Sequence, residues 1–140
     1  MEVKRNNRKK VFVTGASPGL IRAVINLLSV EKFEVICLTR QNIEEKVIGI
    51  SWHVGDLLKP ETYERVLSSC DVVLHGAAVT HTINEQEYYE VNLEGTKKLL
   101  SLFEPNAEVR FIFISSRTAS EESGAYGRSK FLAEKALKTG

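Results

Sequence analysis

The sequence predicts an α/β protein with a doubly wound parallel sheet, and two features of its pattern predict that class. Short apolar runs, rich in β-branched residues, alternate with helical apolar spacing along almost all of the 140 residues. The apolar runs lack alternating polar positions, which is typical of strands covered on both faces. A chain of this length can bury one core. We therefore expect one domain at 10–140, preceded by a basic N-terminal tail at 1–9.

The first strand is expected at 10–14 and the first helix from Pro18, with a glycine-containing turn between them. Apolar residues of that helix recur at helical spacing, so the helix should lie along the sheet. These apolar residues are Leu20, Ala23, Val24, Leu27 and Leu28.

The rest of the chain continues the alternation. Strands are expected at 33–38, around 47–54, at 72–75 and at 110–115, and helices at 60–68, 84–103 and 125–139. Because parallel crossovers are right-handed, we predict the strand order 3-2-1-4-5. Ligands of such sheets bind at the carboxyl ends of the strands, beside the switch point between the first and fourth strands.

The composition argues against several classes of partner. With 19 basic and 18 acidic residues the chain has no charge excess for nucleic acid or a membrane surface, and the basic cluster at 4–10 is interpreted as a solvated tail. No stretch approaches the ~20 apolar residues of a membrane span, and the apolar run after the cluster is too short for a signal peptide. We expect a soluble, cytoplasmic protein. Cys37 and Cys70 lack a zinc-type spacing, so we expect buried free thiols and no metal site.

The segment after the first strand reads Thr14-Gly-Ala-Ser-Pro-Gly-Leu-Ile-Arg22. Gly15 can adopt the backbone angles of a tight turn, and Gly19 lets the main chain approach a pyrophosphate at the start of the helix. We expect cofactor contacts from this turn, namely from Gly15, Ser17, Gly19 and Leu20. A purely structural strand-to-helix turn is the alternative.

The end of the second strand bears on which nucleotide binds. An acidic residue there would bind the adenosine ribose of NAD, but the sequence reads Leu38-Thr39-Arg40. Arginine pairs with phosphate in a bidentate manner, so we predict a preference for NADP over NAD. Arg40 is the first candidate for the 2′-phosphate and Arg22 the second. Arg40 could instead be a solvated loop residue.

Several further motifs follow in a fixed order. They are Gly55-Asp-Leu57, His75-Gly-Ala-Ala78, Val91-Asn-Leu-Glu-Gly-Thr96, Phe111-Ile-Phe-Ile-Ser-Ser116 and Tyr126-Gly-Arg-Ser-Lys130. Together with the glycine turn they resemble the extended short-chain dehydrogenase/reductase family of the NAD-dependent epimerase/dehydratase type. The resemblance extends from 11 to 138 and corresponds to the N-terminal Rossmann portion of that family, truncated before the substrate-binding segment. The turn departs from the family pattern TGxxxGxG at Ile21, which must push the helix outward or fill space near the cofactor, and Pro18 removes one N–H.

The resemblance implies roles for residues that would contact the cofactor. Asp56 would bind the adenine amino group with the backbone of Leu57 beside it, although Asp56 could instead cap a turn. The small residues Ala77 and Ala78 would let the backbone lie against the cofactor, and Ser115 would contact it as well. We assign no chemical role to His53, His75 or His81.

The Tyr126 and Lys130 pair matches YxxxK, and its i,i+4 spacing sets both side chains on one helix face. A neighbouring ammonium favours the phenolate form of Tyr126, which could then exchange a proton with a substrate hydroxyl or carbonyl. The resemblance implies that Lys130 also holds the nicotinamide ribose and that Ser116, assisted by Thr118, polarises the substrate oxygen. Asn92 matches the family's NxxGT, and a buried amide bonded to the backbone is its alternative.

These features predict an NAD(P)-dependent oxidoreductase, epimerase or dehydratase that acts on a small molecule, such as a nucleotide sugar. A non-catalytic dinucleotide-binding module, or a fragment lacking its substrate segment, is the alternative, and a remnant that has lost the cofactor is a third. Without a later strand, the fifth strand should be an edge of the sheet. The resemblance also implies a homodimer formed through the helices of Asn92 and Tyr126.

Overall fold

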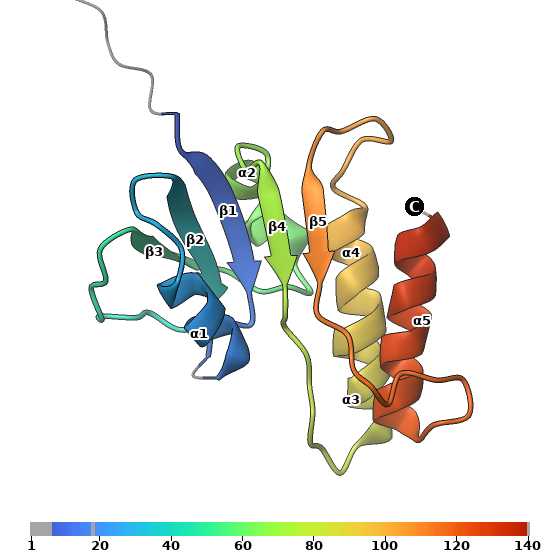
Figure 1. The fold of residues 1–140 in the computed structure, drawn as a ribbon. Coiled ribbons are helices and arrows are strands. Elements are labelled where there is room, and N and C mark those ends of the chain that lie inside the picture. Colours follow the sequence, from blue (N-terminus) through green and yellow to red (C-terminus); the bar gives the residue numbers. More distant parts are fainter. Residues whose placement is uncertain (1–6, 18, 140) are drawn as a thin grey trace, which may run out of the picture.

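The computed structural model describes residues 7–17 and 19–139. Within them, five parallel strands form one sheet in the order β3-β2-β1-β4-β5, which confirms the predicted topology and makes β5 an edge (Figure 1). The strands are β1 (Lys9–Thr14), β2 (Phe33–Thr39), β3 (Ile50–Val54), β4 (Val72–His75) and β5 (Arg110–Phe113).

Two strand boundaries differ from the prediction. β3 begins at Ile50 rather than near Val47, because Gly49 turns the chain with φ +85° and Val47 forms only an antiparallel bridge to Ile50. β5 ends at Phe113, so Ser115 and Ser116 lie in the loop beyond the strand.

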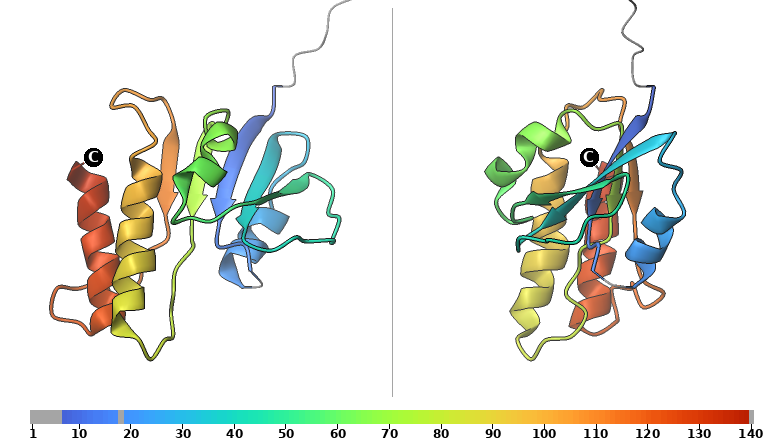
Figure 2. Two further views of the ribbon diagram at one scale, coloured as in Figure 1. Left: turned by 180° about the vertical axis from the view of Figure 1, so that it is seen from behind. Right: turned by 90° about the vertical axis from the view of Figure 1, so that its left-hand side faces the viewer.

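The helices occupy both faces of the sheet. α1 (Leu20–Asn26) lies on one face (Figure 1), and α2 (Glu64–Leu67) lies on the other with the long helix (Figure 2). The long helix runs without a break through α3 (Glu85–Tyr88), the π-helical η2 (Tyr89–Gly95) and α4 (Thr96–Leu100), and α5 (Ala125–Thr139) packs against it. The predicted helix at 60–68 is divided at Tyr63 into a 3-10 turn, η1 (Pro60–Thr62), and α2. No helix among the described residues is long and apolar enough to span a membrane.

The sequence predicted the existence of α1 but not its buried face. Ile21 and Ile25 are 6% and 2% exposed, whereas the expected Leu20 and Leu27 are 66% and 86% exposed. Two apolar stripes overlap on this helix, and both fit the helical period. The stripe through Ile21, Ile25 and Leu28 is the one that packs on the sheet. The predicted start at Pro18 lies outside the described residues.

Alternate residues of β1 enter two cores, one on each face of the sheet. Val11 and Val13 pack under α1, whereas Phe12 packs on the opposite face with α2 and α4. The predicted buried free thiols are confirmed, because Cys37 lies in the first core and Cys70 in the second. Burial raises the pKa of the two thiols to about 12 and about 11.

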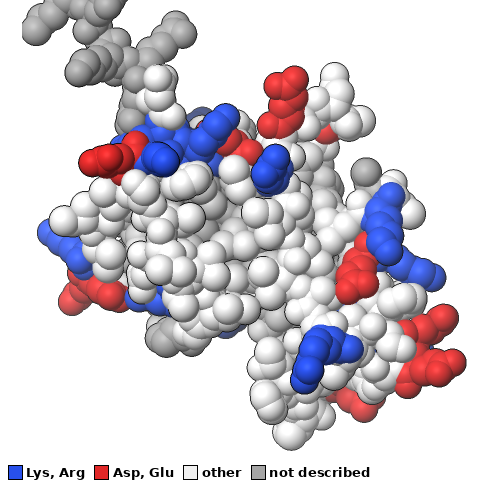
Figure 3. Space-filling model, viewed as in Figure 1, with Lys and Arg blue, Asp and Glu red and all other residues white. Residues whose placement is uncertain are grey.

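The α1 side of β4 and β5 is partly open. Ile112 pairs in register with Leu74 of the first core and is 42% exposed, and among the described residues no helix covers it (Figure 1). Lys, Arg, Asp and Glu lie mainly around the rim of this face, and its centre is uncharged (Figure 3). This uncharged surface lies beside the carboxyl ends of the central strands.

Candidate active site

The glycine turn and the segment after β4 meet where β1 and β4 end side by side. Gly15 has φ +80°, and a Cβ placed on it would lie 2.5 Å from the carbonyl carbon of Gly76 and 2.6 Å from the nitrogen of Ala77. These are backbone atoms that cannot give way, so the position requires glycine. Gly19, with φ +148°, caps α1, and a Cβ there would meet no described atom within 4 Å. The turn is therefore tightly packed against the backbone after β4 at Gly15, and the space beside Gly19 is open.

Ile21 is the residue that departs from the glycine pattern. Its side chain fits because Gly76, directly after β4, has no side chain. A Cβ on Gly76 would lie 2.6 Å from both Cγ1 and Cδ1 of Ile21. The Ile21 side chain thus occupies the room that a side chain on Gly76 would need. It is buried in the core under α1. Ser17 of the turn and Leu20, the first residue of α1, are exposed.

A buried histidine joins the ends of β1 and β4 to the long helix. The hydroxyl oxygens of Thr14 and Thr96 lie 2.6 Å and 2.9 Å from Nδ1 and Nε2 of His75. Thr96 donates its one hydroxyl proton to the carbonyl oxygen of Asn92 at 2.7 Å. The Thr96 oxygen must therefore accept from Nε2–H of His75, and Nδ1 accepts the Thr14 proton. Burial, with a smaller contribution from the Lys130 charge, lowers the pKa of His75 to about 3, so the ring is neutral.

The same threonine of β1 fixes the segment after β4. The Thr14 oxygen accepts hydrogen bonds from the backbone nitrogens of Gly76 and Ala77 at 3.1 and 3.0 Å. Ala77 and Ala78 follow directly and are half-buried. The backbone at Gly76 and Ala77 is therefore held by hydrogen bonds to β1.

Asn92 connects this segment to the helix of Tyr126. Its Oδ1 accepts from the Val79 nitrogen at 2.8 Å, and its Nδ2 donates to the Val79 carbonyl at 3.1 Å and to the Ser129 hydroxyl at 3.0 Å. Ser129 in turn donates to the Tyr126 carbonyl at 2.7 Å. Asn92 lies in the π-helical η2, a geometry common at functional sites. The amide is satisfied by backbone, as the alternative interpretation expected, and also by a side chain of α5.

Lys130 is deeply buried on α5. It is 2% exposed, its Nζ donates to the Ile114 carbonyl at 2.7 Å, and it lies 4.3 Å from the Phe113 ring centroid. Burial lowers the pKa of Lys130 to about 8, an effect that the Glu134 carboxylate opposes. Glu134 also accepts a hydrogen bond from the Ser115 hydroxyl. The ammonium is thus held at the carboxyl end of β5.

The three predicted catalytic residues come near the same end of the sheet but are not bonded to one another. Ser116 lies 2.9 Å from the Thr118 hydroxyl and accepts from the Thr118 nitrogen at 3.2 Å. The half-buried Tyr126 ring lies 6.0 Å from the Tyr88 ring. Within the described part of the chain, no hydrogen bond joins Ser116, Tyr126 and Lys130.

The predicted adenine-binding residues form a tight turn. Oδ1 of Asp56 accepts from the Leu58 nitrogen at 2.9 Å, which is the turn-capping role given as its alternative. Leu57 is 8% exposed, and its carbonyl accepts from the Tyr63 hydroxyl at 2.9 Å. A Cβ on Gly95 would lie 2.9 Å from Leu57, which explains the glycine of NxxGT by packing.

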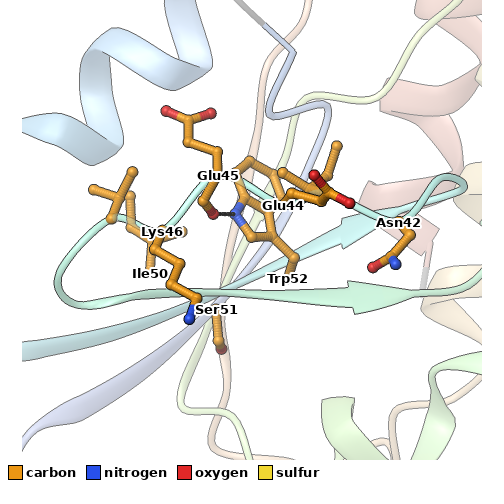
Figure 4. A pocket seen from close by; sticks show the side chains of 9 residues that line it. Asn42, Glu44, Glu45, Lys46, Ile50, Ser51 and Trp52 are labelled. Atoms are coloured by element: carbon orange, nitrogen blue, oxygen red, sulfur yellow. Dashed lines mark hydrogen bonds between the residues drawn. The ribbon is translucent and has the colours of Figure 1, made fainter.

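The two candidate arginines differ in their surroundings. Arg40 is exposed directly after β2, whereas Arg22 contacts the glycine turn, Glu45 and the Trp52 ring. Residues 42–47 and 50–52 line a cavity of about 480 Å³ beside this contact (Figure 4).

Several residues that position the site had no predicted role. They are Thr14, Thr96 and Ser129 of the buried network, Glu134 behind Ser115, and the Glu45 and Trp52 pair beside Arg22. Thr14, Thr96 and Ser129 lie inside quoted motifs, so their place in the motif was an available signal. No local pattern marked the others.

Three comparisons place the chain among known proteins. A family model described as the NAD dependent epimerase/dehydratase family matches residues 11–139. UDP-glucose 4-epimerase of Vibrio cholerae is 27% identical over 129 residues, which is 88% of this chain and 39% of that protein. A decarboxylating sterol-4-alpha-carboxylate 3-dehydrogenase of Dictyostelium discoideum is 28% identical over 155 aligned residues, covering 92% of this chain and 47% of that protein.

Among solved structures, a short-chain dehydrogenase/reductase superfamily protein from Agrobacterium tumefaciens with bound NAD superposes with a TM-score of 0.75. Its sequence identity is 24%, and the match covers 93% of this chain and 44% of that chain. This likeness shows the fold. The chain spans less than half the length of each of these three proteins.

Proposed function

This chain belongs to the NAD dependent epimerase/dehydratase family, and from that membership we propose that it binds a nicotinamide dinucleotide for hydride and proton transfer at a hydroxyl or carbonyl of a small molecule. The observation that carries the proposal is the glycine turn. Gly15 is held against the backbone of Gly76 and Ala77, while the side of Gly19 where a Cβ would project is open. A pyrophosphate needs this combination of a fixed turn and close access to the main chain.

The described residues fit such a cofactor. The pyrophosphate would be held by Gly15, Ser17, Gly19 and Leu20, and the 2′-phosphate by Arg40. The adenine would be bound by Asp56 and Leu57. The nicotinamide end would be held by Ala77, Ala78, Ser115, Tyr126 and Lys130. When bound, the cofactor supplies or accepts the hydride. Arg40 supports a preference for NADP over NAD.

The proton would move through Tyr126. The Lys130 ammonium lies on the same helix, four residues after Tyr126. With its pKa near 8, Lys130 is charged at neutral pH. Ser116, held by Thr118, would donate a hydrogen bond to the substrate oxygen. The bonds from Asn92 to Ser129 and from Lys130 to Ile114 hold α5 in a fixed place for this chemistry.

We also propose nucleotide sugars as a substrate class, since one relative is named UDP-glucose 4-epimerase. A homodimer through the helices of Asn92 and Tyr126 is proposed on the family resemblance. Cofactor binding without turnover is a second candidate function. It is favoured by the lack of any hydrogen bond joining Ser116, Tyr126 and Lys130 within the described part of the chain.

A titration with NADPH and NADH, followed by cofactor fluorescence, tests the proposal. We expect saturable binding that is lost in Gly19→Val, because the added side chain enters the open space at the turn and the φ of +148° strains any residue other than glycine. Gly124→Val is the control, since a Cβ at Gly124 also meets no described atom within 4 Å. No binding of either cofactor by the unchanged protein would overturn the proposal. Binding without reduction of any tested ketone or nucleotide sugar would favour the second candidate.

A further inference from the structure

Arg22 is held between the glycine turn and the loop that follows β2. Its Nε donates to the Ala16 carbonyl at 3.2 Å, and one terminal nitrogen donates to both carboxylate oxygens of Glu45 at 3.4 and 3.3 Å. Its guanidinium carbon lies 5.0 Å from the Trp52 ring centroid. Contacts from a turn, a loop and a strand therefore fix this guanidinium.

Trp52 also places Glu45. The indole nitrogen donates to the Glu45 carbonyl at 3.2 Å, the bond drawn as a dashed line in Figure 4. The Glu45 carboxylate points toward the ribbon of α1, whereas that of Glu44 points in a different direction (Figure 4). Of two adjacent carboxylates on the loop, one is thus directed to Arg22.

This arrangement brings an acidic group to the region that selects the nucleotide. In a dinucleotide fold the adenosine ribose lies between the glycine turn and the end of the second strand, where a carboxylate favours the ribose diol and an arginine the 2′-phosphate. Residues 38–40 offer no carboxylate. Glu45 follows the same strand and reaches the turn through Arg22, which bonds to Ala16.

We infer that Glu45 is a selectivity-determining residue of the cofactor site, and this inference rests on the proposed dinucleotide binding. Its carboxylate neutralises Arg22 and so weakens binding of a 2′-phosphate, which leaves Arg40 to pair with that group. An incoming phosphate must displace Glu45 from Arg22 or lie beside a second negative charge, and either costs affinity. A 2′-hydroxyl requires neither. The ratio of NADPH to NADH affinity is therefore lower than two unpaired arginines would give.

The test is Glu45→Gln, with Glu44→Gln as the matched control on the same loop. We expect NADPH to bind about fivefold more tightly in Glu45→Gln, the scale of one partly exposed ion pair, and NADH affinity to change by less than about twofold. Glu44→Gln should change neither affinity. In an Arg22→Gln background, Glu45→Gln should give no gain, because the arginine that it frees is absent.

The outcomes separate this inference from the proposed function. If both cofactors bind but Glu45→Gln leaves their affinity ratio unchanged, the inference is wrong and dinucleotide binding stands. A purely structural pair would give that result, with a change only in the free energy of unfolding. A gain that persists without Arg22 would also overturn the inference. If the unchanged protein binds neither cofactor, the proposed function itself fails.

Discussion

The region around β4 and α5 holds its polar groups differently from the region around α1 and β3. In the first region Asn92, Thr96 and Ser129 are at most 1% exposed and bond to one another or to nearby backbone. In the second, the paired side chains of Arg22 and Glu45 are 20% and 53% exposed. Water cannot replace a lost partner in the buried network, whereas it can replace either partner of the surface ion pair.

This difference separates what fixes the fold from what adjusts the ligand. Changes in the buried region should cost folding free energy, because each lost partner leaves a desolvated polar group. Changes in the surface pair should leave folding nearly intact and alter affinity.

Gly15 contacts Gly76 at the boundary of the two regions. Of the substitutions considered, a side chain at Gly15 should destabilise the fold most. Gly15→Val combines a φ of +80° with backbone atoms 2.5 to 2.7 Å from the new Cβ. We expect a loss of about 4 kcal/mol in the free energy of unfolding, measured in urea. Gly124→Ala, with open space around it, should change this free energy by less than about 0.5 kcal/mol. Equal effects of the two changes would refute the packing argument.

Lys130 should give the buried region a distinctive pH dependence. Its folded pKa of about 8 lies below the ordinary 10.5, so the folded state is penalised while the ammonium is charged. As pH rises from about 8 to 10.5, the folded protein releases this proton before the unfolded chain does, and stability rises relative to Lys130→Met. We expect the wild type to gain about 2.5 kcal/mol on this variant between pH 7 and pH 10. Parallel stability curves for the two proteins would show that Lys130 is not buried in this way.

Ile21 and Gly76 should behave as a coupled pair across the two regions. Gly76→Val places a side chain where Ile21 lies, so we expect a loss of about 2 kcal/mol from overpacking. In Ile21→Ala the same change should cost much less, because the two Ile21 atoms at 2.6 Å are then gone and the Thr14 carbonyl oxygen at 3.2 Å is the close contact that remains. A double-mutant cycle of unfolding free energies measures the coupling. Additive losses would contradict the assignment of Ile21 to this space.

Thr96→Val removes the acceptor of the His75 Nε2–H and keeps the side-chain shape. We expect a loss of about 1.5 kcal/mol, the cost of a buried donor without a partner. Thr139→Val is the control, because the Thr139 hydroxyl bonds only to α5 carbonyls in an exposed position. Calorimetric unfolding of both variants makes the comparison. A Thr96→Val protein as stable as the control would refute the tautomer assigned to His75.

The sequence predicted the sheet well because its cues are local. Five short apolar runs marked the strands, and right-handed crossovers fixed their order. The predicted buried face of α1 was wrong, because two apolar stripes fit one helical period. The choice between them depended on the space left by Gly76, which lies more than fifty residues away in the sequence. β3 was placed too early because the turn at Gly49 interrupts the apolar run.

The candidate site was predictable only where its residues form motifs. The spacing of Tyr126 and Lys130 was visible in the sequence, but the bond from Lys130 to the Ile114 carbonyl depends on how α5 packs on β5. Glu45 followed no recognisable spacing, because a loop of irregular backbone carries it back to Arg22. Pairings of this kind depend on tertiary structure, and local periodicity does not encode them.

The most direct test of the proposed dinucleotide site is to map backbone amide shifts by NMR while NADPH or NADH is added to the protein. We expect the largest changes at Gly15, Ser17, Gly19, Ala77 and Ala78, with smaller changes around Glu45. Saturable changes confined to residues 42–52, or no changes with either cofactor, would contradict the claim that this glycine turn is a dinucleotide site.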